Sequence, residues 1–461
     1  MKKICSIILV LTMVLGILTA CGQDDSKKTN DGTKDQGTAS NNDANANKKT
    51  AEKEREKLII SLDKMPEDVK LARAIEEVQE MEKYSHVDFE IHGKEADFLT
   101  TMPITVAGGE QRDLVAVAQP ILQQQWADAG TIQPLTKMIE SLGLDFEKEF
   151  GPYAANAMNN GEYYTIPHNI TKWALYYNKK IFDEAGIPYP DPKVPMTWDD
   201  YRALAKQLTS GEGAEKKYGA LYLTWPMFWY GEAIMTLGGG QHFYNEEGLS
   251  NIEDPAFAHA LQKTFDMMHV DKSIPTHADV VISKTKPTAF MNGQYGMAVQ
   301  GGWILSWAAD KENYPRDFEI GIAPMPVDEG TTPKTWGIVN GFAIAQTSAN
   351  PELALEVGMD LSRLSAQYAM AAPEANQTVE QNLLYTGMGD KLGAEGMTTE
   401  VLLDIFANPE TAFLTEKVTG ANAPTYEKVI NEEVEKFLVE EQDLDTTINN
   451  IKARGDKKIL D

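Results

Sequence analysis

The stretch from Gly161 to Phe182 constrains the fold of this chain more than any other. It begins with an aromatic and β-branched run, Tyr163–Ile166, which is typical of a β-strand. Pro167 then removes a backbone donor, so we expect a continuous strand ladder to end there. A second strand-like run, Trp173–Tyr177, follows the break. Two strands with a polar break between them suit a chain that passes from one lobe to another.

The N-terminus has the features of an export signal. Lys2 and Lys3 precede an apolar run, 4–20, that is short for a membrane-spanning helix. Small residues then precede Cys21, as in bacterial lipoproteins whose cysteine is acylated and becomes the new N-terminus. We therefore expect residues 1–20 to be a lipoprotein signal peptide and Cys21 to be the lipidation site. The alternative is an ordinary signal peptide in which Cys21 is incidental.

Composition limits the partners and the chemistry of the rest. Residues 21–57 are mostly small or polar, so we expect a disordered tether behind a lipid anchor. The other cysteine, Cys5, lies within the expected signal peptide, so the mature chain would have no disulfide. The net charge of −27 disfavours nucleic acid and anionic lipid as partners. The seven histidines show no metal-binding spacing, and we expect no cofactor.

Aromatic residues gather most densely in the segment 224–230. Trp225, Phe228 and Trp229 belong to this cluster, which holds more aromatic rings than one buried helix face needs. Such rings can stack on the apolar face of a sugar while polar neighbours bind its hydroxyl groups. The alternative is a core turn with Trp225 inside.

An ordered set of weak motifs carries a family resemblance over residues 57–461. The set comprises the strand–proline–strand stretch described above, the run from Phe290 to Trp303 with its glycines and final tryptophan, and the glycine-containing strand Trp336–Ile344. Together they resemble the extracellular solute-binding proteins of ABC importers, in the maltose-binding-protein-like branch that takes sugars. No single motif is specific to this family, but the order of the motifs along the chain is.

The resemblance implies an α/β fold of the periplasmic-binding-protein type (type II). Each lobe would be a mixed sheet flanked by helices, and several strands would form the hinge. The first lobe would comprise 58–166 and 320–346, and the second 167–319 and 347–461. The polar segment 373–420 gives no prediction.

The resemblance also implies where the ligand lies. In open α/β sheets ligands bind beyond the carboxyl ends of strands. The loops after two expected strands, 58–62 and 113–117, would therefore face the ligand. Trp303 would stack on the ligand in the cleft, unless it packs under its helix. The expected ligand-binding residues are Asp63, Lys64, Gln119, Thr171, Trp225, Phe228, Trp229, Trp303, Trp336 and Asn340.

We therefore expect a monomeric, lipid-anchored receptor on the outer face of a cell membrane. It would capture a carbohydrate, in particular an oligosaccharide, by hinge closure and deliver it to the permease of an ABC importer. One alternative is the same fold binding a peptide, polyamine or metal. Another is a surface glycosidase, because 69 acidic residues leave room for a catalytic pair. The sequence contains no nucleophile or metalloenzyme motif, which favours a binding protein over an enzyme.

Overall fold

A computed structural model describes residues 55–63, 69–93, 97–117, 120–367, 375–379 and 382–461. All of them belong to one unit of the chain, Lys53–Asp461. The expected signal peptide, Cys21, most of the expected tether, Lys64 and Gln119 lie outside the described residues.

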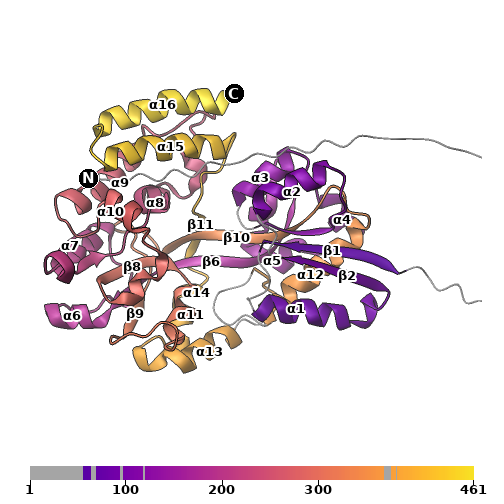
Figure 1. Ribbon diagram of the computed structural model, residues 1–461, viewed down its shortest axis with the longest axis horizontal. Helices are drawn as coiled ribbons and strands as arrows, with labels where there is room; N and C mark the ends of the chain where they lie inside the picture. The colour runs from indigo at the N-terminus through magenta and orange to yellow at the C-terminus, as the bar shows by residue number, and fades with distance from the viewer. Residues whose placement is uncertain (1–54, 64–68, 94–96, 118–119, 368–374, 380–381) are drawn as a thin grey trace, which may run out of the picture. The chain divides into compact units, whose positions relative to one another are not determined.

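One nine-stranded mixed sheet runs through the described chain in the order β2-β1-β3-β10-β6-β8-β7, with β11 on β10 and β9 on β6. Figure 1 shows β6 and β10 running side by side from one group of elements to the other. We call the group around β1, β2 and β3 the first lobe and the group around β7, β8, β9 and β11 the second lobe. The strands are β1 Glu56–Leu62, β2 Val87–Gly93, β3 Leu114–Val117, β6 Thr165–Asn178, β7 Tyr218–Ala220, β8 Tyr295–Gly301, β9 Ile320–Ala323, β10 Lys334–Ile344 and β11 Ala412–Thr415. A separate hairpin pairs β4 Met158–Asn159 with β5 Glu162–Tyr163.

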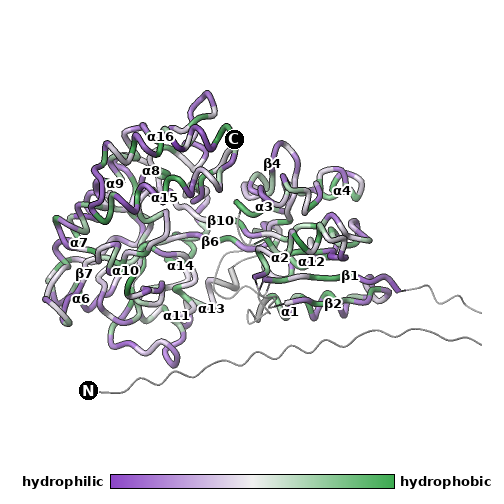
Figure 2. Tube along the Cα trace, turned by 45° about the horizontal axis from the view of Figure 1, so that its top comes forward, coloured by the Kyte–Doolittle hydropathy of each residue, from purple (hydrophilic) through white to green (hydrophobic). Residues whose placement is uncertain are grey.

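The first lobe has helices on both faces of its sheet. Its strand β1 is buried from Leu58 to Leu62 and apolar there except for Ser61, as expected for a strand buried on both sides (Figure 2). Helices α1 and α12 pack on one face, and α2 and α3 cover the other, where Trp126 is buried. The helices are α1 Val69–Glu80, α2 Phe98–Ala107, α3 Pro120–Asp128, α4 Thr136–Ser141, α5 Phe146–Phe150 and α12 Pro351–Gln367.

The second lobe is built in the same three-layer way. Helices α7, α8, α9 and α15 pack on one face of its sheet, and α11, α13 and α14 on the other. A capping box begins α7, because the side chains of Thr197 and Asp200 each accept the other's backbone N–H. The helices are α6 Lys179–Ala185, α7 Trp198–Leu208, α8 Met227–Leu237, α9 Pro255–His269, α10 His277–Ser283, α11 Ile304–Ala309, α13 Asn382–Leu392, α14 Thr399–Phe406, α15 Ala423–Leu438 and α16 Leu444–Leu460.

Strand β6 does not end at Pro167, contrary to the sequence expectation. It continues for 14 residues, and its register against β10 shifts between Asn340 and Gly341, opposite Pro167 and Asn169. Pro167 has no backbone N–H to donate, and it is tolerated here because the bulge locally interrupts the ladder. The free Pro167 carbonyl accepts a hydrogen bond of 2.7 Å from the Ser362 hydroxyl on α12.

Two segments lie in the opposite lobe from the one expected. Strand β9, expected in the first lobe as part of 320–346, pairs with Leu175–Asn178 of β6 and is buried in the second lobe. Helix α12, expected in the second lobe as part of 347–461, packs against α1 and β6 in the first. Strand β9 is entirely apolar, and the apolar side of α12 would suit either sheet, so the sequence could not indicate which sheet would cover them.

Candidate functional site

Three half-buried aromatic rings meet over one buried tryptophan in the second lobe. The rings of Trp225, Phe228 and Trp303 lie 5.4–6.1 Å from the ring of Trp173 on β6, all roughly edge to face. Trp173 itself is only 2 % exposed. We call Trp225, Phe228 and Trp303 the aromatic platform. Because the platform rings keep part of their surface free, they can offer stacking area to a ligand.

The sheet explains why these rings come together. Strands β7 and β8 are parallel, so their carboxyl ends lie at one edge, and Trp225 and Trp303 follow those two ends. The Trp303 ring lies on Gly301, where an added Cβ would come within 2.2 Å of the ring. Its Nε1 donates to Oε1 of the buried Gln300 at 3.0 Å, which holds the orientation of the ring.

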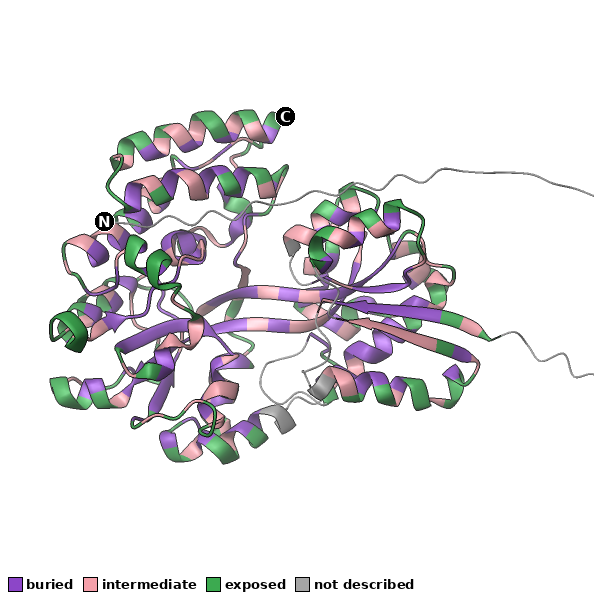
Figure 3. Cartoon of the chain, in the orientation of Figure 1, coloured by how far each residue is buried: buried purple, intermediate pink, exposed green. Residues whose placement is uncertain are grey.

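Polar side chains lie on the same face of the sheet, where β6 and β10 pass between the lobes. Side chains alternate along a strand, so Asn169 and Thr171 share the face of Trp173. Asn340 of β10 donates through Nδ2 to Oδ1 of Asn169 at 3.2 Å, while its own Oδ1 has no partner. We call Asn169, Thr171 and Asn340 the polar row. All three are half-buried, and this middle part of the two strands is visibly less buried than their ends (Figure 3).

Two residues expected at the ligand are core residues instead. Trp229 and Trp336 are each 2 % exposed. Trp336 stacks on Trp198 with ring centroids 5.8 Å apart and contacts Gly231, where an added Cβ would come within 2.5 Å of its ring. Trp229 is buried beside α10, where its ring centroid lies 5.9 Å from that of His277. The expectation that either residue contacts the ligand is therefore corrected.

The first lobe contributes Asp63, which directly follows β1 and is half-buried. Two hydrogen bonds between described side chains and groups of the opposite lobe connect the lobes. The Thr415 hydroxyl donates to Oδ1 of Asn156 at 3.1 Å, and Nε2 of Gln124 donates to the Gly420 carbonyl at 3.0 Å. These bonds define where the lobes touch, in addition to the strands they share.

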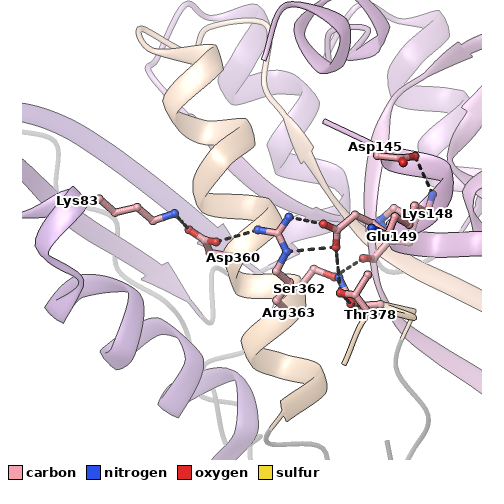
Figure 4. A network of polar contacts seen from close by, with 10 residues as sticks. Lys83, Asp145, Lys148, Glu149, Asp360, Ser362, Arg363 and Thr378 are labelled. Carbon is pink, nitrogen blue, oxygen red and sulfur yellow. Dashed lines mark hydrogen bonds and ion pairs between the residues drawn. The ribbon is translucent and has the colours of Figure 1, made fainter. Parts of the chain in front are cut away.

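A polar network anchors the segment 375–379, which leads from the first lobe to the second (Figure 4). Arg363 on α12 bonds both Asp360 and Glu149, and Lys83 pairs with Asp360. Glu149 also accepts a hydrogen bond of 3.4 Å from Thr378. Burial raises the pKa of Glu149, but the bonds from Arg363, Asn376 and Thr378 outweigh burial and leave that pKa below its ordinary value. The segment is therefore held to the first lobe.

Sequence reasoning missed Glu416, which directly follows β11 and is 5 % exposed. Burial raises the pKa of Glu416 to about 7, although Lys417 and the Trp173 indole N–H both favour its charged form. Its Oε2 has no hydrogen-bond partner. The segment around Glu416 carries no hydrophobic periodicity, and its place against Trp173 depends on the pairing of β11 with β10.

No metal centre is found in the described part of the chain, since no three His, Cys, Asp or Glu side chains there lie close enough to share an ion. None of the helices described has both the length and the apolar composition to cross a membrane.

Comparison with known proteins places the sequence in one family of binding proteins. Residues 68–357 match the model of the family described as bacterial extracellular solute-binding protein. The chain is 25 % identical over 348 residues to the sn-glycerol-3-phosphate-binding periplasmic protein UgpB of Agrobacterium fabrum, which covers 72 % of this chain and 76 % of that one.

Solved structures share the fold. One is an open conformation of a sugar transporter from Rhizobium etli, with a TM-score of 0.70, 22 % identity and coverage of 88 % of this chain and 99 % of that one. Another is an ABC substrate-binding protein from Listeria monocytogenes in complex with cycloalternan, with a TM-score of 0.69, 20 % identity and the same coverage. The expected two-lobe fold is thus confirmed. Since the family match spans more than half of the sequence, the chain belongs to the bacterial extracellular solute-binding proteins, which bind solutes for ABC importers and are not enzymes.

Proposed function

We propose that this protein binds a carbohydrate, in particular an oligosaccharide, between the aromatic platform and the polar row. The observation that carries this proposal is their common face of the sheet, which combines apolar rings with neutral hydrogen-bonding groups. A pyranose ring presents the same combination, since its C–H face is apolar and its edge carries hydroxyl groups. The Listeria structure that shares this fold holds cycloalternan, which supports a sugar ligand.

The charge of the site argues against a phosphorylated ligand of the kind named for the Agrobacterium relative. The platform and the polar row contain no lysine or arginine, so Lys64 is the one cation among the proposed ligand residues, whereas phosphate recognition favours several such cations. The same set argues against a metal, because Asp63 is its one carboxylate and it contains no imidazole, whereas a metal would need several such groups.

The mechanism we propose is closure of the two lobes about β6 and β10. A sugar that contacts both lobes binds the closed state more tightly and shifts the population towards it. Asp63, Lys64 and Gln119 would supply the contacts from the first lobe. The closed form would then dock on the permease of an ABC importer.

Calorimetry of the mature protein against an oligosaccharide panel, with sn-glycerol 3-phosphate included, tests the proposal. We expect heat from at least one sugar and none from the phosphate. We also expect Trp303→Ala to weaken the binding of that sugar by about 1–2 kcal/mol, which is roughly a tenfold loss of affinity. The control is Trp307→Ala, because Trp307 lies on α11 but contacts Tyr314 and not the platform. A ligand that binds Trp303→Ala as tightly as the parent protein would remove the platform from the site.

We also propose that Cys21 carries a lipid anchor that holds the monomeric receptor at the outer face of the cell membrane. The small residues before Cys21 and the polar stretch after it support this arrangement. Metabolic labelling with a palmitate analogue should mark the parent protein and Cys5→Ser but not Cys21→Ser. Equal labelling of the Cys21→Ser protein would exclude the anchor.

A further inference from the structure

A second pocket lies on the face of β6 and β11 opposite the aromatic platform. Along β6, Lys172 points to the other side from Thr171 and Trp173. Along β11, Phe413 and Thr415 line this pocket, whereas Leu414 packs in the core cluster of Trp173. The pocket has a volume of about 520 Å³, which is within the range of small-molecule sites. We call it the rear pocket.

Both lobes build the rear pocket. Tyr153 and Asn156 come from a 3-10 helix, Gly151–Ala157, whose apolar residues belong to the first-lobe core. Phe406 ends α14 of the second lobe. The lining residues are Pro152, Tyr153, Asn156, Lys172, Gln377, Val379, Tyr385, Phe406, Ala407, Asn408, Pro409, Thr411, Ala412, Phe413 and Thr415. An occupant would therefore touch both lobes.

The electrostatics of the rear pocket are unusual for this chain. Among the described residues, its lining includes one lysine and no carboxylate, although the protein has 69 acidic residues and a net charge of −27. Lys172 is 7 % exposed, and its Nζ donates to the Phe406 carbonyl at 2.6 Å and lies 5.8 Å from the centre of the Tyr153 ring. No acidic residue of the described chain forms an ion pair with it.

A buried ammonium group without a counter-charge is costly, and an ammonium has three donors of which one is used here. Burial lowers the pKa of Lys172 to about 8, so the group remains largely charged at neutral pH. Beside it, the rings of Tyr153 and Phe413 meet edge to face at 5.5 Å and form an apolar wall. An anionic group with an apolar body would satisfy both features.

We propose that the rear pocket binds a small organic anion, with its anionic group against Lys172 and its apolar body against Tyr153 and Phe413. The anion satisfies the unused donors of the lysine and supplies a counter-charge that none of the described residues provides. The aromatic walls exclude water from part of the occupant and favour a flat or apolar body over a fully hydrated inorganic ion.

The position of the rear pocket has a consequence for sugar binding, and this step rests on the proposed function. A rotation that brings the lobes together on the platform face separates them on the rear face. An anion that holds Tyr153 and Lys172 close to Phe406 opposes this rotation. It therefore lowers the affinity for sugar, and by linkage the sugar lowers the affinity for the anion by the same factor.

Titration of the full mature protein with benzoate and with phenyl phosphate tests the proposal and distinguishes carboxylate from phosphate as the anionic group. We expect roughly millimolar binding of at least one of them. Lys172→Met should weaken it by about tenfold or more, the cost expected for a charge-assisted hydrogen bond. The matched control is Lys334→Met, because Lys334 also donates to a backbone carbonyl, that of Met235, but lies outside the rear pocket.

A surface variant covers the case in which Lys172→Met fails to fold. Ala412 is exposed at the rim of the pocket, so Ala412→Asp should leave the fold intact and repel the anion. Absence of binding by both probes, or equal binding by the parent protein and Ala412→Asp, overturns the proposal. Sugar titrations with and without the bound probe measure the coupling separately. Sugar binding without anion binding contradicts only this inference, and anion binding without sugar binding contradicts only the proposed function.

Discussion

At the scale of single residues, Glu416 is a carboxyl group that folding removes from water. It is buried beside the indole of Trp173, and its nearest charged neighbours along the chain and on α15 are Lys417 and Glu427. The positive Lys417 favours the ionised form, but burial and the negative Glu427 disfavour it more strongly. The carboxyl beneath the platform is thus a proton-binding group in the neutral range.

This burial predicts a decrease of stability with rising pH. Because the folded-state pKa of about 7 lies above the unfolded value, the folded protein binds a proton between pH ~4.5 and 7 that the unfolded chain releases. The free energy of unfolding should therefore fall by an amount on the order of 2–3 kcal/mol over this interval. Urea unfolding at pH 5 and pH 8 measures the difference, and Glu416→Gln should reduce it. Glu410→Gln, at an exposed position of the same loop region, should leave it unchanged.

Which residues lie at the platform could be predicted only in part. The aromatic content of 224–230 and the tryptophan after the glycine-rich run indicated Trp225, Phe228 and Trp303. Sequence spacing could not separate Trp229, which faces the core, because α8 is apolar nearly all round. The position of Glu416 depends on the pairing of β11 with β10, and that of Lys172 on the side to which a buried strand residue points. Neither property can be predicted from the local sequence.

At the scale of helices and strands, α15 and α16 are joined by one buried carboxylate. Glu433 accepts hydrogen bonds from Gln442 at 3.1 Å and from Asn450 at 3.1 Å, and it pairs with Lys436 and Arg454. Burial raises the pKa of Glu433, but these donors outweigh burial and lower it to about 2. The ionised carboxylate is therefore part of the folded state.

Loss of the Glu433 carboxylate should weaken the attachment of α16 to α15. We expect Glu433→Gln to lower the free energy of unfolding by about 1–3 kcal/mol at pH 7, since several donors would lose their charged acceptor. The contribution of the parent carboxylate is present above pH ~4.5 and is lost as the pH falls towards 2. Thermal unfolding at pH 7 and pH 3 measures both effects. Glu432→Gln is the control, because Glu432 bonds the same Arg454 from an exposed position and should have little effect.

The existence of most strands and helices could be read from apolar runs, caps and prolines, whereas their lobe assignment could not. Strand β9 and helix α12 show why. Strand β9 and the apolar side of α12 could be covered by either sheet. The choice depends on β6, with which β9 pairs and against which α12 packs, and the paired residues Ile320 and Asn178 are more than 140 residues apart in the chain. Contacts between residues so far apart in the chain are set by the whole fold.

At the scale of the whole molecule, the two lobes share strands β6 and β10 and are joined outside them by side-chain hydrogen bonds. The bond from Thr415 to Asn156 lies at the rear pocket, on the face opposite the platform. If closure on the platform face separates the rear face, this bond breaks when the sugar binds.

Removal of this bond should therefore favour closure. We expect Thr415→Val to raise the affinity for sugar about two- to tenfold, corresponding to one hydrogen bond of about 0.5–1.5 kcal/mol. Calorimetry with the sugar identified in the panel measures the affinity, and small-angle scattering without sugar measures the shift in compactness. An affinity that falls or stays the same would argue against a hinge that opens at the rear.

The alternation of β6 has a consequence for how this sequence can change over time. Neighbouring positions of one strand send an indole towards the sugar side and an ammonium group towards the rear pocket. Insertion or deletion of one residue before Lys172 would move the indole to the rear-pocket side and the ammonium group to the sugar side. Related sequences are therefore expected to vary at these positions by substitution, and to change the length of this strand only in steps of two.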